Sequence, residues 1–286
     1  MKELRDLVAE ELSLPVDSRV SAVATAIAAQ HGEAARAVLF YGSALREKQL
    51  DGLMLDFYLI VSDYRAAYAK RWLSLANRLI PPNVFYFESG GLVTKYAVLS
   101  EADFARLCGP GASSVSVWAR FAQPSRLVWT SNEAARSHAI DAVAAAAPTL
   151  LAAAGPKPGE EPLDLWRRAF FLSYSAELRA ERKGRAGSVV DVDPARYERF
   201  TGQSLAVART IHPHGSWGWR RIEGKALSIV RLAKASLTFA GGADYIAWKI
   251  NRHAGTKIQL KPWQQRHPLL AGISLLPRLL MSGAVR

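Results

Sequence analysis

Cysteine is nearly absent from this sequence: Cys108 is the single one in 286 residues. One cysteine forms neither an internal disulfide nor a structural zinc site, which is typical of a reducing compartment. Long apolar runs are absent too. The best candidate, residues 268–281, is interrupted by Pro277 and Arg278 and is too short to span a bilayer. We therefore expect a protein that is soluble or lies on a membrane surface.

We expect no secretory signal at the beginning of the given sequence. Its first seven residues are charged and lack an apolar block, and Glu3 and Asp6 argue against a mitochondrial transit peptide. Half of the residues are hydrophobic, enough for a packed core without disulfides or structural metals. These features predict a cytoplasmic protein.

Acidic residues are scarce at the C-terminal end. Of the formal net charge of +12, residues 220–286 hold +10, because twelve Lys or Arg residues there accompany only Glu223 and Asp244. Apolar residues alternate with these cations, for example along 222–239. Such a basic amphipathic segment favours a polyanion, either nucleic acid or an anionic membrane surface. The alternative is that these helices pack on the protein and their charges form a solvated face.

Two short apolar runs, residues 38–41 and 57–61, are bounded by turn signals and predict two β-strands. Gly42 follows the first run and allows the backbone to pass close to a ligand, while Ser43 stands where a helix would begin with its N–H groups facing an anion. Asp56 starts the second strand. A phosphate-binding turn beside a carboxylate predicts a site for a nucleoside triphosphate and its metal ion. By itself, the same pattern also fits an ordinary turn and a solvated carboxylate.

The second strand holds only one of the carboxylates expected there. A Gly-Ser turn followed by a carboxylate-bearing strand is the layout of the nucleotidyltransferase fold, which usually places two aspartates two residues apart so that both reach one Mg²⁺. Around Asp56, those positions hold Met54 and Tyr58. Asp51 could help only from the preceding loop. The remaining metal ligands must therefore come from elsewhere in the chain.

The rest of the sequence predicts a mixed α+β half followed by a mostly helical half. We predict a helix over 19–32, a helix over 64–79, a β-hairpin over 83–99 with a turn at 89–91, an alanine-rich helix capped by Ser131, a linker over 155–162, and helices over 163–182, 193–211 and 222–239. The predicted division is a nucleotidyltransferase-like domain (1–153), a helical domain (163–221) and a basic amphipathic membrane-contact segment (222–286).

Several segments resemble the mitochondrial-type phosphatidate cytidylyltransferase family, the translocator assembly and maintenance proteins. The similar segments are Tyr41-Gly42-Ser43, Met54-Leu55-Asp56-Phe57, the strand 92–100, the stretch 119–125 and the helix 172–179. Their order and approximate spacing match the family from about residue 38 to 200. The family also has a single aspartate in the strand that corresponds to the one with Asp56. This partly explains why the second aspartate usual in the nucleotidyltransferase fold is missing here.

The resemblance implies transfer of a cytidylyl group from CTP to phosphatidic acid, giving CDP-diacylglycerol and pyrophosphate. It implies that Asp56 and Glu177 bind Mg²⁺ and that Lys95 acts on a phosphate. The implied nucleotide-binding residues are Tyr41, Gly42, Ser43 and Arg179, and the implied lipid phosphate-binding residues are Arg182 and Lys183. Taken singly, Lys95, Glu177 and Arg179 would be interpreted as solvated surface residues.

Two departures separate the chain from the family pattern: Ala44 replaces a glycine, and Ala176-Glu177 replaces a Gly-Asp pair. The longer arm of Glu177 could alter the ligand geometry or the substrate preference. The leading interpretation is a peripheral enzyme on the inner face of the membrane, with an anionic lipid surface rather than nucleic acid as its partner. The alternatives are a nucleotidyltransferase acting on RNA or another phosphate acceptor, and a catalytically inactive scaffold of the same fold.

Overall fold

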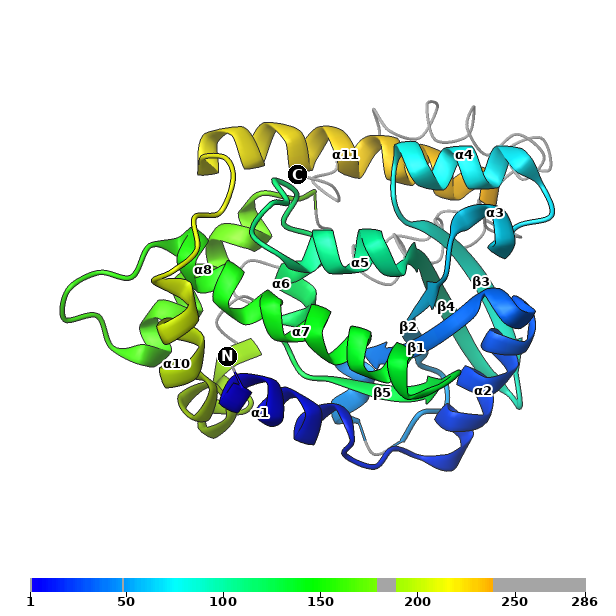
Figure 1. The fold of residues 1–286 in the computed structure, drawn as a ribbon, viewed down its shortest axis with the longest axis horizontal. Coiled ribbons are helices and arrows are strands. Elements are labelled where there is room, and N and C mark those ends of the chain that lie inside the picture. Colours follow the sequence, from blue (N-terminus) through cyan, green and yellow to red (C-terminus); the bar gives the residue numbers. More distant parts are fainter. Residues whose placement is uncertain (1, 48, 179–188, 239–286) are drawn as a thin grey trace.

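The computed structural model describes residues 2–47, 49–178 and 189–238 (Figure 1). The strands are β1 (Ala35–Tyr41), β2 (Met54–Val61), β3 (Asn83–Ser89), β4 (Leu92–Ser100) and β5 (Ser125–Thr130). The helices are α1 (Lys2–Leu12), α2 (Ser18–Ala29), α3 (Tyr64–Ala67), α4 (Arg71–Leu79), α5 (Glu101–Cys108), α6 (Trp118–Phe121), α7 (Glu133–Ala154), α8 (Pro162–Ser175), α10 (Pro194–Ala208) and α11 (Trp217–Thr238).

The strands form one mixed sheet in the order β3-β4-β2-β1-β5. β2 and β4 are parallel, and the other neighbouring strands are antiparallel. β2 is buried on both faces, which explains its nearly continuous apolar sequence. The expected α+β class, with a mixed sheet followed by helices, is confirmed.

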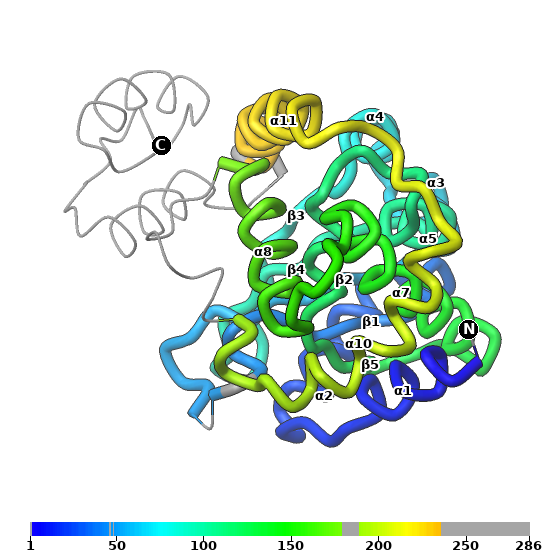
Figure 2. Tube along the Cα trace, turned by 90° about the vertical axis from the view of Figure 1, so that its left-hand side faces the viewer, coloured from blue at the N-terminus to red at the C-terminus, as the bar shows by residue number. Residues whose placement is uncertain are grey.

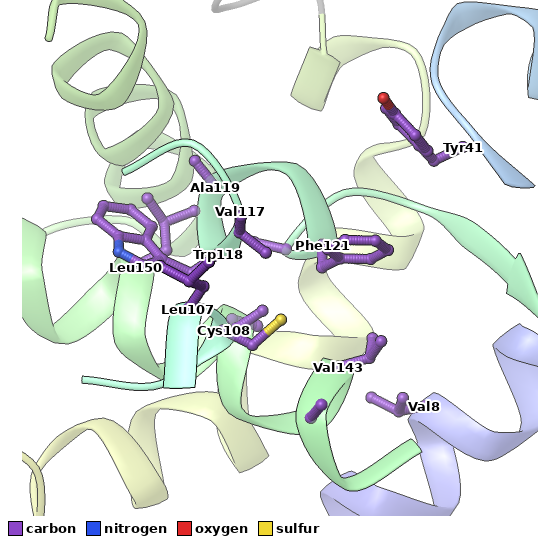
Figure 3. Packing of buried hydrophobic residues seen from close by; sticks show 14 of the residues in the cluster. Val8, Tyr41, Leu107, Cys108, Val117, Trp118, Ala119, Phe121, Val143 and Leu150 are labelled. Atoms are coloured by element: carbon purple, nitrogen blue, oxygen red, sulfur yellow. The ribbon is translucent and has the colours of Figure 1, made fainter. Parts of the chain in front are cut away.

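Each face of the sheet has its own hydrophobic cluster. Along β2, Phe57 and Leu59 pack toward α2, while Tyr58 and Ile60 lie on the other face with residues of α5, α6 and α7. This alternation follows from the two-residue period of a strand. Trp118 and Leu150 are fully buried in the second cluster, where Figure 3 shows their packing. Asp56 has the parity of Tyr58, so its side chain belongs to the α7 face.

The helix α7 is the centre of the helical layer and contacts α1, α5, α6, α8 and α10 (Figure 2). Within the described residues it is the single helix long and apolar enough to cross a membrane, and 56% of that apolar window is buried inside the protein. Its packing is that of a core helix. The cluster on this face contains residues of both α7 and α10, so one core joins the two predicted domains, and their division stays a prediction.

Several predicted boundaries change. The helix expected over 64–79 is split into α3 and α4, because Tyr68 between them is buried in the sheet cluster. Asn132, rather than Ser131, caps α7 by accepting a hydrogen bond from Ala135 N. The helix expected over 163–182 ends at Ser175. The helix expected at Ser43 is a four-residue 3₁₀ turn, η2 (Ser43–Arg46), too short to present a helix dipole to an anion.

Candidate functional site

A single row of residues crosses all five strands at one end of the sheet. The row runs Tyr86, Lys95, Asp56, Tyr41 and Ser125, each paired with the next by the strand register. Residues directly opposite one another in a sheet share a face, so the register alone brings three of the predicted site residues together. Two of these were predicted from segments about forty residues apart in the chain.

Asp56 and Lys95 form an ion pair on this row. Lys95 Nζ lies 2.9 Å from Asp56 Oδ1, and the side chains are 26% and 20% exposed for Lys95 and Asp56, respectively. Asp56 Oδ1 is a buried atom with no hydrogen-bond partner in the described part of the chain. A half-buried pair of opposite charges that retains solvent access is suited to exchanging a partner for a ligand.

Gly42 lies directly against the Asp56 carboxylate. Its backbone has φ of 93°, a conformation that favours glycine. A Cβ atom added there would lie 2.9 Å from Asp56 Oδ2. The neighbour that this glycine approaches closely is the Asp56 carboxylate, and the predicted approach of its backbone to a ligand stays a prediction. Ser43, the next residue, is exposed at the start of η2.

Tyr41 and Tyr58 place a partly buried arginine beside this row. Arg120 of α6 donates from Nη1 to Tyr58 Oη at 3.1 Å, and its guanidinium carbon lies 5.2 Å from the centre of the Tyr41 ring. Burial raises the pKa of the Tyr41 phenol well above its usual value, so the phenol stays protonated at neutral pH. Tyr58 stands where a second aspartate was expected, and it accepts a hydrogen bond from an arginine instead.

A second arginine, Arg231 of α11, meets Arg120 at Ser116. Arg231 Nη1 donates to Ser116 Oγ at 2.9 Å, and Arg120 Nη1 donates to the backbone oxygen of the same residue at 3.4 Å. Burial lowers the pKa of the Arg231 guanidinium, and Tyr58 and Glu177 oppose that effect. Two guanidinium groups from distant helices thus converge near the sheet row.

Glu177 interacts electrostatically with both arginines. Burial lowers the pKa of the Arg120 guanidinium, but Tyr41, Tyr58 and Glu177 raise it, and the net result lies well above the usual value. Among these three groups, Glu177 is the carboxylic acid. Glu177 follows the end of α8, in a segment packed on α11: Leu178 N donates to Ser228 Oγ at 3.3 Å.

The structure thus brings Tyr41, Gly42, Asp56 and Lys95 together, with Glu177 on the arginine side of the same region. Arg179, Arg182 and Lys183 lie outside the described residues. Asp51 is exposed and paired with Arg19 at 3.1 Å. Sequence reasoning did not assign roles to Arg120 and Arg231. Arg120 lies in the stretch 119–125 that carries part of the family resemblance, which was the available signal.

The acidic side chains near the strand row could contribute to a metal site only in small number. Among the described residues, no group of three or more His, Cys, Asp or Glu side chains could hold a metal ion. A nucleotide-bound Mg²⁺ ion usually needs only one or two protein carboxylates, because phosphates and water supply the other oxygen ligands. Asp56 fits that requirement if Lys95 Nζ, which lies 2.9 Å from Oδ1, releases the carboxylate to the ion.

The chain has little similarity to known proteins. No family model matches the chain, and no curated protein sequence matches it. Among solved structures, it is similar to a nucleotidyltransferase-like protein from Exiguobacterium sibiricum 255-15, with a TM-score of 0.29 and 9% identity over 92% of each chain.

Proposed function

We propose that the chain is a Mg²⁺-dependent nucleotidyltransferase, and that it transfers the cytidylyl group of CTP to phosphatidic acid or a related lipid phosphate. The observation that carries the proposal is the contact of Gly42 with Asp56 on a strand row that also holds Tyr41 and Lys95. This geometry supports the general reaction class. The choice of CTP and of a lipid acceptor rests on the resemblance of the five sequence segments.

The chemistry requires no general base. An oxygen of the acceptor phosphate, already ionised at neutral pH, attacks the α-phosphorus of CTP. The bond between that phosphorus and the bridging oxygen breaks, and pyrophosphate leaves with the electron pair. When bound, Mg²⁺ neutralises negative charge on the phosphate oxygens. Asp56 would hold the ion, with Glu177 as its second carboxylate, while Gly42 and Ser43 would let the triphosphate approach the backbone.

The basic side chains would neutralise the rest of the negative charge of the two substrates. Lys95 would release Asp56 to the metal and neutralise a phosphate oxygen as a point charge. Arg120 and Arg231 would keep the adjoining region positive, with Glu177 limiting their mutual repulsion. Arg179 would contact the nucleotide, and Arg182 and Lys183 would bind the phosphate of the lipid. The enzyme would work on the cytoplasmic face of an anionic membrane, through residues 222–286.

The test is incubation of the full chain with labelled CTP, Mg²⁺ and vesicles carrying a panel of lipid phosphates, scored for a labelled lipid. We expect a labelled product with phosphatidic acid, and its loss in Asp56→Asn. Asp51→Asn is the matched control, because it removes a nearby carboxylate that is exposed and paired with Arg19. It should retain full activity.

Three other outcomes would redirect the proposal. Full activity in Asp56→Asn would overturn the assigned mechanism. Label transferred to RNA in place of lipid would show a nucleotidyltransferase with a different acceptor. Absence of Mg²⁺-dependent CTP binding, measured by calorimetry on the folded protein, would favour an inactive scaffold.

A further inference from the structure

The short helix α4 exposes large apolar side chains to solvent. Trp72, Leu75 and Leu79 are 45%, 58% and 69% exposed, respectively. Their spacing of three and four residues places them along one side of the helix. The residue that α4 buries completely is Asn77, which donates to Val98 O at 2.9 Å on strand β4. A helix that served only to cover the sheet would bury its tryptophan and leucines.

Cations border this apolar stripe. Lys70, Arg71 and Arg78 are exposed, and the sequence from 70 to 79 contains no acidic residue. Basic residues beside an exposed tryptophan and leucines are typical of helices that lie in a membrane interface. The stripe with these three cations is called the α4 face below.

The helix α11 extends the α4 face. Both views show α11 and α4 side by side along the same side of the molecule (Figures 1 and 2). Arg231 Nε donates to Pro81 O at 2.9 Å, and Lys234 Nζ donates to Pro82 O at 2.8 Å, just after α4 ends. With these two cations directed inward, α11 leaves large apolar residues exposed on its other sides, among them Ile229, Val230 and Leu232.

We propose that the α4 face, together with the exposed apolar residues of α11, docks on an anionic lipid bilayer. The apolar side chains would enter the interface, and the cations would meet acidic headgroups. The inference deepens the membrane contact of the proposed function and rests on that function only for the choice of a bilayer. Its test contains no nucleotide, so docking and catalysis can fail separately.

Charge argues against two other occupants. Residues 239–286 contain seven Lys or Arg residues and one acid, Asp244, so this segment would add positive charge to a face that is already basic. A second copy of the chain would present the same cations. An anionic bilayer supplies both the apolar phase and the opposite charge.

The experiment is cosedimentation of the full chain with vesicles of equimolar phosphatidylcholine and phosphatidylglycerol, compared with phosphatidylcholine alone. Leu75→Ser should weaken binding to the acidic vesicles about tenfold, because burial of one leucine is lost. Leu14→Ser is the matched control: Leu14 is also exposed, at 44%, and it follows α1, a helix on the opposite side of the molecule from α4 (Figure 1). It should bind as the wild type does.

A second pair tests the charges. Lys70→Glu should weaken binding to acidic vesicles, and Lys2→Glu, which changes an exposed lysine on α1, should not. Trp72→Phe should reduce the quenching of tryptophan fluorescence by brominated acidic lipid. All three positions are exposed, so the substitutions should leave the fold intact, which circular dichroism checks.

The proposal is overturned if Leu75→Ser binds acidic vesicles as tightly as Leu14→Ser. It is overturned equally if the wild type binds no vesicles. In that case, a fall in molar mass for Leu75→Ser by light scattering would identify a second copy as the occupant, and faster proteolysis after residue 239 in that variant would identify the chain's own C-terminal segment.

Discussion

Lys95 and Asp56 are paired by charge across two parallel strands, with Lys95 Nζ 2.9 Å from Asp56 Oδ1, while that oxygen makes no hydrogen bond among the described residues. The register of β2 and β4 fixes the pair, because the two residues stand directly opposite each other. The arrangement holds a carboxylate and an ammonium group together at the edge of solvent. Each can therefore turn to a ligand of opposite charge without movement of the backbone.

Gly42→Ala is predicted to damage the site more than the fold. The new methyl group would lie 2.9 Å from Asp56 Oδ2, and the positive φ of 93° would cost about 1–3 kcal/mol. We expect Mg²⁺-dependent nucleotide turnover to fall at least about tenfold, because the carboxylate must shift. Turnover and thermal unfolding measure the two effects.

Gly52→Ala is the control for backbone strain. Gly52 also has a positive φ, of 75°, but an added Cβ would have no neighbour within 4 Å. This variant should show a similar fall in the free energy of unfolding and unchanged turnover. Equal loss of turnover in both variants would contradict the importance of the contact between Gly42 and Asp56.

Lys95→Met is predicted to reduce kcat/KM about a hundredfold with little loss of stability. A partly exposed ion pair contributes at most about 1 kcal/mol to folding, whereas a positive charge at a transferring phosphate is worth several kcal/mol. Steady-state kinetics and urea unfolding separate these quantities. Lys157→Met, at an exposed loop lysine, should change neither. A Lys95→Met variant with normal kinetics would show that the lysine only neutralises Asp56.

Local signals explain which parts of the fold could be predicted. The strands β1 and β2 are short apolar runs buried on both faces, and the turn of the β3–β4 hairpin holds two glycines with positive φ. These features depend on nearby residues alone. The prediction of one continuous helix over 64–79 was wrong, because the interruption at Tyr68 depends on packing against the sheet. A periodic pattern contains no information about that contact.

The candidate site was predictable in the half that the strands position. Gly42 and Asp56 are fourteen residues apart along a strand–turn–strand unit, so their contact follows from local geometry. Arg120 and Arg231 were not assigned, because α6 and α11 bring them to Ser116 from segments more than a hundred residues apart. Arg231 and Lys234, interpreted as part of a basic face, donate to backbone carbonyls instead.

Glu177→Gln is predicted to lower the free energy of unfolding and also to weaken the binding of Mg²⁺. Loss of its charge removes a carboxylate that offsets the burial of Arg120 and Arg231, although Glu223 still acts on Arg231; the loss should cost about 1–3 kcal/mol of unfolding free energy. If Glu177 also holds Mg²⁺, the Mg²⁺ concentration for half-maximal turnover should rise several-fold. Urea unfolding and a Mg²⁺ titration of turnover give the two values.

Glu160→Gln provides the comparison for Glu177→Gln. Glu160 pairs with Arg168 at 2.6 Å and accepts a hydrogen bond from Lys157 N at 3.1 Å, both away from the strand row. Its substitution should change the free energy of unfolding and leave the Mg²⁺ titration unchanged. An identical Mg²⁺ titration in both variants would remove Glu177 from the metal site and leave its role as a partner of the arginines.

Lys234 should make stability rise with pH above neutrality. Burial, aided by the charge of Arg231, lowers the pKa of this lysine from 10.5 to about 7. Below about pH 7, both the folded and unfolded states hold the proton, and folding bears the full cost of a buried charge. Between about pH 7 and 10, the folded state loses the proton and the unfolded state keeps it, so the free energy of unfolding should rise by up to about 1.4 kcal/mol per pH unit. Urea unfolding across that pH range should show no such rise in unfolding free energy for Lys234→Met. Lys225→Met, at an exposed position of α11, should show the same rise as the wild type.

Equal pH dependence of the unfolding free energy in the wild type and Lys234→Met would contradict this prediction. It would show that the Lys234 ammonium stays charged while it donates to the carbonyls of Ile80 and Pro82.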